Sequence, residues 1–226
     1  MRKLVLGNVN YSSWSIRALL VARKTGLGLK EDVIPLDFPE TSTQLRKISP
    51  TAKVPLLIWD DLHIWESLAI TEFLAEHAPA GSVWPQAAAP RAIARALTAE
   101  MHAGFPALRK ACWMDIRGRH DTPEMTDTLK ADIARMLDLW KTTRETYGAD
   151  GPFLFGKWSA ADAFYAPIVT RFRTWNLPLD DNGRAYSEAV FADPAMQQLE
   201  KEAAAEPWWI DYGPDGRSSG YLKDKP

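Results

Sequence analysis

The pattern of hydrophobic and polar positions in residues 1–79 alternates between short apolar runs typical of strands and the spacing typical of helices. A short apolar run at 3–7 is typical of a buried strand, and apolar residues recur at helical spacing in 16–24. Ser15 is the expected N-cap of this helix, and Gly26 lies where the helix should end. The pattern therefore predicts a strand followed by a helix.

The same segment continues with further strands. A second strand is expected at 32–36, and a short helix at 43–47 lies in an otherwise irregular stretch. Two apolar runs, 54–59 and 62–65, flank a two-residue acidic turn and predict a β-hairpin. A helix at 68–77 then follows. The order strand, helix, strand, loop, strand, strand, helix predicts a small mixed sheet with helices packed on it.

Helical patterns dominate the rest of the chain. The clearest covers 124–147, where apolar residues form one stripe. Pro106 predicts a break in the helical stretch 91–112. Two further helices are expected, at 159–175 and 194–205.

A stretch rich in Pro and Ala separates these two regions. We therefore expect an α/β domain at 1–79, a linker at 80–90 and an all-α domain at 91–226.

Composition narrows the range of functions. Hydrophobic residues make up 46% and charged residues 25%, which is typical of a globular protein, and the net charge of −2 argues against a nucleic-acid partner. The single Cys112 predicts no internal disulfide, and the 4 His residues share no metal-ligand spacing, so no metal is expected. No apolar run is long enough for a signal peptide or a membrane span, so we expect a cytoplasmic protein without a membrane partner.

The first candidate site is the loop 10–15, between the first strand and the first helix. Ligands gather at the carboxyl ends of strands in open α/β sheets, and a helix N-terminus there favours an anion. Ser12, Ser13 and Ser15 place three hydroxyls at this point. One of them could cap the helix only, or one could donate a hydrogen bond to a bound thiolate.

Two further segments suggest a peptide-like ligand. A cis bond before Pro55 would turn the backbone of Val54 outward, where it could pair with an extended ligand, whereas a trans bond would be merely structural. Ser67 begins a helix and could bind a carboxylate, with Glu66 beside it to hold an ammonium group. The alternative is a capped surface helix with a solvated Glu66.

Together these segments resemble the glutathione transferase family, in the order that the family has them. The segment 49–56 is similar to the one before that family's cis-proline, and 66–74 to its acidic-Ser pair and following helix. In 156–162, Ser159 and Asp162 resemble the capping motif of the helical domain, in which the Asp reaches back to a backbone N–H.

The resemblance implies a thioredoxin-like N-terminal domain, glutathione as co-substrate, a small apolar electrophile as substrate and a homodimer. It implies that glutathione is bound by Lys53, Val54, Pro55, Glu66 and Ser67.

The resemblance also suggests which hydroxyl contacts the sulfur. Serine-type members place the catalytic Ser five residues before an Arg, as Ser12 lies before Arg17, so Ser12 is the first choice. Ser13 is the second choice and Tyr11 a lesser one.

The serine loop further resembles maleylacetoacetate isomerases, the zeta class of the family. That class has Cys where this chain has Trp14, and commonly Gln where it has Glu66. We therefore expect a glutathione transferase. The alternatives are a glutathione-dependent isomerase and a non-catalytic binding or scaffold protein of the same fold.

Overall fold

A four-stranded mixed sheet forms the N-terminal part of the computed structural model, which describes residues 2–212 and 218–224. The strand order is β2-β1-β3-β4, with β2 parallel to β1, and β3 antiparallel to both β1 and β4. This confirms the predicted α/β arrangement. The strands are β1 (Arg2–Leu6), β2 (Lys30–Val33), β3 (Leu56–Trp59) and β4 (Leu62–Trp65).

Both faces of the two central strands are covered, which explains their unbroken apolar runs. Leu4 and Leu6 of β1 and Leu57 of β3 face the main core, while Val5 and Leu56 belong to a smaller cluster on the other face. The edge strand β4 is mostly exposed. The sheet therefore sits between the main core and a second, smaller one.

Three helices accompany this sheet: α1 (Ser13–Thr25), α2 (Thr41–Arg46) and α3 (Ser67–His77). α1 ends as predicted at Gly26, whose φ of 68° places it in the left-handed region that glycine adopts without strain. The predicted N-cap of α1 was wrong, because α1 begins earlier and Ser12, not Ser15, caps it. The Oγ of Ser12 accepts the backbone N–H of Ser15 at 3.3 Å.

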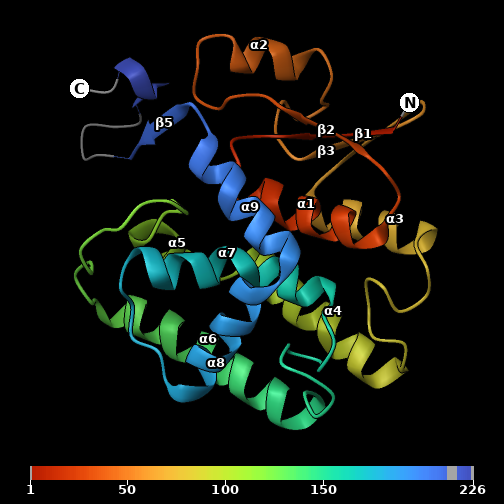
Figure 1. Cartoon of the computed structure of the whole chain (residues 1–226), viewed down its shortest axis with the longest axis vertical. Helices are drawn as coiled ribbons and strands as arrows, with labels where there is room; N and C mark the ends of the chain where they lie inside the picture. Colours follow the sequence, from red (N-terminus) through yellow and green to blue (C-terminus); the bar gives the residue numbers. More distant parts are fainter. Residues whose placement is uncertain (1, 213–217, 225–226) are drawn as a thin grey trace.

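The C-terminal part is mainly helical, and in Figure 1 its helices lie below the sheet, with α9 passing between the two regions. The predicted break at Pro106 is confirmed. α8 was not predicted, because Gly183 in its first turn and the Asp-rich start resemble a loop. The helices are α4 (Ala88–Ala103), α5 (Pro106–Ala111), α6 (Asp127–Tyr147), α7 (Ala160–Thr174), α8 (Asp181–Ala192) and α9 (Pro194–Ala205).

The prediction that this region is all-α needs one correction. β5 (Trp208–Asp211) and β6 (Ser218–Tyr221) form a two-stranded antiparallel sheet, followed by the 3-10 helix η1 (Leu222–Asp224). β5 has only four residues, of which three are apolar, and it pairs with a largely polar strand. Such a short run does not separate strand from helix by periodicity.

α7 lies at the centre of the molecule and is buried along most of its length. It packs against α1 and α4, and α1 also contacts α3 and α9. The predicted capping motif is present: Asp162 accepts the backbone N–H of Ser159 at 2.8 Å. Within the described residues, no helix is long and apolar enough to cross a membrane.

Candidate functional site

A cavity of about 310 Å³ lies where the N-terminal domain meets α4. It brings together four of the predicted ligand-binding residues from two separate segments and adds three residues that were not predicted. Ser12, Ser13 and Ser67 do not line it, although Ser13 and Ser67 are each next in sequence to a lining residue. The lining residues are Trp14, Thr51, Lys53, Val54, Pro55, Glu66 and His102.

The backbone of Val54 is available to a ligand at the wall of this cavity. The Val54–Pro55 bond is cis. The register of β3 with its neighbours begins at Leu56, so Val54 lies outside the ladder. Neither its N–H nor its C=O has a hydrogen-bond partner among the described residues. An extended ligand could therefore pair with Val54 as an added strand.

Glu66 precedes α3 in an unusual backbone conformation. Its φ of 69° and ψ of 124° place it in a sparsely populated backbone region, which costs a non-glycine residue roughly 1–3 kcal/mol. Such strained residues cluster at ligand sites. Its carboxylate is half-exposed, and Oε2 lies 3.7 Å from Nε2 of His102. A cationic group of a ligand could reach this carboxylate.

Ser67 is the first residue of α3 and is fully buried. Its hydroxyl has no hydrogen-bond partner within the described part of the chain. A helix N-terminus leaves its first N–H groups unpaired and carries a partial positive charge, so it favours an anion. Ser67 and the start of α3 thus offer unused donors beside Glu66.

The hydroxyls of Ser12 and Ser13 differ in what they already contact. The hydroxyl of Ser12 donates to Oγ of Ser15 at 2.8 Å, and Oγ of Ser15 accepts the N–H of Gly7 at 2.9 Å. Ser12 therefore has the capping role that the sequence left open. The hydroxyl of Ser13, in the first turn of α1, has no hydrogen-bond partner among the described residues and is free to donate.

Trp14 lines the cavity and packs against two arginines, of which Arg17 is buried and Arg109 half-buried. The guanidinium carbons of Arg17 and Arg109 lie 4.4 Å and 4.9 Å from the Trp14 ring centroid. Arg17 is 1% exposed, and neither its Nε nor its Nη1 has a partner among the residues described. Burial, reinforced by Arg109 and Arg171, holds the pKa of Arg17 well below its usual value. These cations create a positive potential behind the cavity.

His102 of α4 was not predicted as a site residue. Its ring meets Trp14 edge-on at 5.0 Å between centroids. Burial lowers its pKa, and repulsion from Arg17 and Arg109 adds to this effect, while Glu66 opposes it. The imidazole is therefore neutral at pH 7. No short motif marks this residue, because α4 brings it to the site from a distant part of the sequence.

Tyr11, the lesser candidate for the sulfur contact, does not line the cavity. It is buried, and its hydroxyl accepts a hydrogen bond from Nη2 of Arg117 at 3.2 Å. Its ring packs near that of Tyr212, at 6.5 Å between centroids. Tyr11 thus contacts the C-terminal segment.

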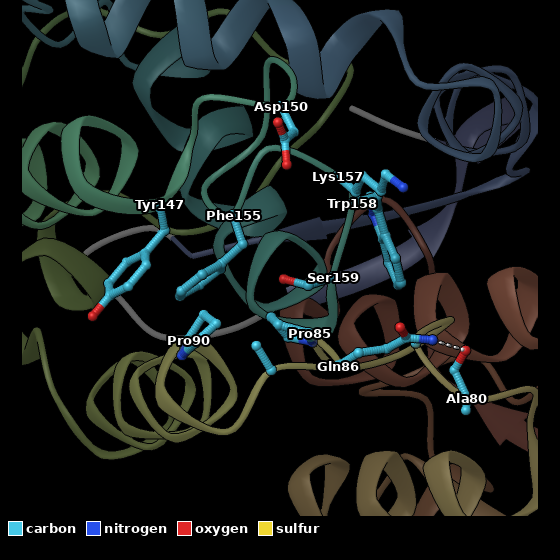
Figure 2. A pocket seen from close by; sticks show the side chains of 12 residues that line it. Ala80, Pro85, Gln86, Pro90, Tyr147, Asp150, Phe155, Lys157, Trp158 and Ser159 are labelled. Atoms are coloured by element: carbon cyan, nitrogen blue, oxygen red, sulfur yellow. Dashed lines mark hydrogen bonds between the residues drawn. The ribbon is translucent and has the colours of Figure 1, made fainter.

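A second, larger cavity of about 470 Å³ lies between the predicted linker and the loop before α7. Figure 2 shows Tyr147 and Phe155 stacked on one side and Gln86 on the other, where its amide donates to the carbonyl of Ala80. Its walls share no residue with the predicted ligand site. The described residues contain no group of three or more His, Cys, Asp or Glu that could hold a metal ion.

Comparisons with known proteins identify the family of each domain. Residues 11–77 match the glutathione S-transferase N-terminal domain family, and residues 91–212 match the glutathione S-transferase C-terminal domain family. A probable maleylacetoacetate isomerase from Caenorhabditis elegans is 34% identical over 42% of this chain, but the match spans only 44% of that protein. Maleylacetoacetate isomerase of Rattus norvegicus is 28% identical over 74% of this chain and 76% of its own length.

Solved structures show the same fold. A glutathione transferase homologue from Burkholderia GL BGR1, with bound glutathione, superposes with a TM-score of 0.67 at 24% identity, covering 91% of this chain and 99% of the other. A bacterial maleyl pyruvate isomerase of the zeta class gives a TM-score of 0.70 at 22% identity, covering 91% and 98%. With both domain families matched over most of its length, the chain belongs to the glutathione S-transferase family.

Proposed function

We propose that this protein is a glutathione transferase that binds glutathione in the 310 Å³ cavity and uses its sulfur as a thiolate. The observation that carries the proposal is the set of unused polar groups around this cavity. The free backbone of Val54 pairs with the cysteinyl residue of glutathione. Ser67 and the start of α3 bind the γ-glutamyl carboxylate, Glu66 binds the γ-glutamyl ammonium group, and Lys53 binds the second carboxylate.

The start of α1 supplies the chemistry for the thiol. A free thiol has a pKa of about 8.5, so only a few per cent of it is thiolate at pH 7. A hydroxyl from Ser12 or Ser13, the helix N-terminus and the buried Arg17 all favour the anion. A fall of about two pKa units corresponds to about 2.7 kcal/mol and makes the thiolate the main form.

The reaction itself is an attack by this thiolate. The sulfur lone pair forms a carbon–sulfur bond with the electrophilic carbon, and the leaving group departs with its own electron pair. Trp14 and His102 also line the cavity, and their rings suit a small, largely apolar electrophile. Because His102 is neutral, it does not compete with the ammonium group of the ligand for the carboxylate of Glu66.

Binding and turnover test this proposal separately. We expect the protein to be retained on immobilised glutathione and to conjugate a chlorinated nitroaromatic compound. Ser67→Ala should weaken glutathione binding about tenfold, because one hydrogen bond to a charged group is lost. Binding without turnover across a panel of electrophiles would instead support the non-catalytic scaffold protein. Absence of glutathione binding would refute the proposal altogether.

Isomerisation is the second candidate, because two of the relatives carry the name maleylacetoacetate isomerase. In that reaction the thiolate adds to a cis double bond and leaves again after rotation. A cis-enone dicarboxylate, assayed beside the chlorinated nitroaromatic, separates the two activities. Faster turnover of the cis-enone would favour the isomerase.

We also infer a homodimer and a cytoplasmic location. The family resemblance carries this inference, and the exposed Leu62 and Trp65 of β4 and Ile93 of α4, at 54%, 42% and 39%, are apolar side chains that a second copy could cover. Sedimentation that shows a monomer at micromolar concentration would contradict the dimer. The cytoplasm keeps thiols such as glutathione reduced, and cell fractionation tests the location.

A further inference from the structure

The loop that carries Ser12 and Ser13 is held at its base by a residue from the far end of the chain. Glu206, which follows α9, is 7% exposed. Its Oε1 accepts the backbone N–H of Val9 at 2.6 Å, and its Oε2 accepts that of Asn10 at 3.1 Å. One carboxylate thus satisfies two consecutive N–H groups of the loop, which is the strong, charge-assisted form of hydrogen bond.

Arg117 completes this contact from a third segment. Its Nη1 donates to the backbone carbonyl of Glu206 at 2.9 Å, and its Nη2 donates to the hydroxyl of Tyr11 and to the carbonyl of Trp208. The backbone N–H of Arg117 donates to Oδ1 of Asn10 at 3.0 Å. The guanidinium group therefore joins the loop, Glu206 and β5.

Asn10 is fixed on several sides at once. Its side-chain NH2 group donates to Oδ1 of Asp115 at 2.7 Å, and its backbone carbonyl accepts the N–H of Ile116 at 3.2 Å. Two residues on, the backbone N–H of Ser12 donates to the carbonyl of Asn8 at 2.8 Å. A shift at Val9 or Asn10 therefore moves the turn from which Ser12 and Ser13 project.

We propose that Glu206 is a positioning residue for thiol activation, and this proposal rests on the proposed function. It fixes the backbone of residues 9 and 10, and so sets where the serine hydroxyls and the first turn of α1 stand relative to the sulfur. Catalytic groups misplaced by about 1 Å can lose about a hundredfold in rate. The C-terminal segment is then part of the site, although it does not line the cavity.

Burial of the carboxylate is consistent with a functional reason for its presence. Burial raises the pKa of Glu206 to about 7, and the hydrogen bonds from Asn10 and Val9 and the charge of Arg117 oppose this rise, while Glu202 adds to it. A buried carboxylate with such a pKa costs stability when it ionises. Glu206 has this cost in stability, and both of its carboxylate oxygens accept hydrogen bonds from the loop.

The test compares Glu206→Gln with the matched control Glu202→Gln. Both remove one acidic side chain from the same end of the chain, but Glu202 pairs with Arg23 and does not contact the loop. The amide introduced by Glu206→Gln can accept a hydrogen bond from only one of the two backbone N–H groups. Its NH2 group is itself a donor and would face the other N–H group. Near-ultraviolet circular dichroism of both variants verifies that they fold.

Two measurements read out the effect. Without glutathione, amide hydrogen exchange in residues 7–12 should become at least about tenfold faster in Glu206→Gln and stay unchanged in Glu202→Gln. With glutathione, the pKa of the bound thiol, followed by thiolate absorbance, should rise by about one unit, which is about tenfold less thiolate at a given pH. The acid limb of the pH–rate profile should move from its wild-type position to the same extent.

The outcomes separate the two proposals. Unchanged exchange in folded Glu206→Gln would overturn the positioning role, even if the wild type is an active transferase. Faster exchange with an unchanged thiol pKa would also overturn it, because the loop would then move without affecting the sulfur. If the wild type binds no glutathione while exchange still accelerates, the contact is real and the proposed function is what fails.

Discussion

Asp162 offers the most quantitative test of how this fold is held together. Its Oδ1 accepts the N–H of Leu154 at 3.2 Å and the hydroxyl of Tyr186 at 3.1 Å. Its Oδ2 accepts the N–H of Ser159 at 2.8 Å and the hydroxyl of Ser159 at 3.1 Å. One buried carboxyl group thus connects the start of the central helix α7, the loop before it and α8.

Its titration has a sign that can be worked out. Burial raises the pKa of Asp162 from 3.8 to about 6, against the opposing effect of its hydrogen bonds. Between about pH 4 and pH 6 the folded state keeps a proton that the unfolded state releases, so the free energy of unfolding falls as pH rises through this window. Two pKa units correspond to about 3 kcal/mol.

The variant Asp162→Asn isolates this effect, because an amide does not titrate here. The amide oxygen can accept hydrogen bonds from one pair of donors, whereas the NH2 group faces the other pair. We therefore expect the free energy of unfolding of Asp162→Asn to be about 2–4 kcal/mol lower than that of the wild type near pH 5. About half of the 3 kcal/mol is already lost at pH 5, and between pH 5 and pH 8 the wild type loses a further amount of about 1.4 kcal/mol. The gap between the two proteins should therefore narrow to about 1–3 kcal/mol near pH 8.

Urea unfolding, followed by tryptophan fluorescence at both pH values, measures the gap. Asp180→Ala is the control, since the exposed Asp180 caps α8 through the N–H of Gly183 and should lose only about 1 kcal/mol. A gap for Asp162→Asn that is equal at the two pH values, or wider near pH 8, would refute the reasoning.

Three shorter predictions concern the site. Ser13→Ala should lower turnover and raise the pKa of the bound thiol with little loss of stability, while Ser12→Ala should also cost about 1 kcal/mol of helix capping, as thermal unfolding would report. Val54→Pro should weaken glutathione binding about tenfold in calorimetry, because the pairing N–H is removed. Arg17→Met should raise the free energy of unfolding by about 1–3 kcal/mol, because Arg17 is buried without a full set of partners among the described residues. The same variant should raise the pKa of the bound thiol, as measured by thiolate absorbance.

The sequence pattern predicted the elements whose periodicity is long or whose burial is complete. The stripe of α6 and the apolar runs of β1 and β3 needed no tertiary information. β5 and α8 were missed, because one is four residues long and the other begins with loop-forming residues. Short elements depend on contacts that a local window does not contain.

The lining of the candidate site was predictable where it consists of contiguous motifs. Val54, Pro55 and Glu66 do line one cavity, and their motifs are short segments of the chain. His102 reaches the same cavity from α4, and only the tertiary fold brings it there. The N-cap of α1 was misplaced for a similar reason, since several serines could cap the helix locally and the turn held by distant residues selects Ser12.

The bond between Glu206 and Val9 joins positions 197 residues apart in the chain. During synthesis the first domain emerges from the ribosome long before residue 206 does, and its sheet can form while the serine turn still lacks its tether. A nascent or truncated chain that ends before residue 206 would therefore contain every proposed ligand-binding residue. Its serine turn would still lack the two hydrogen bonds to Glu206 that fix it. Under the proposed function, such a chain would not yet be competent to activate the thiol.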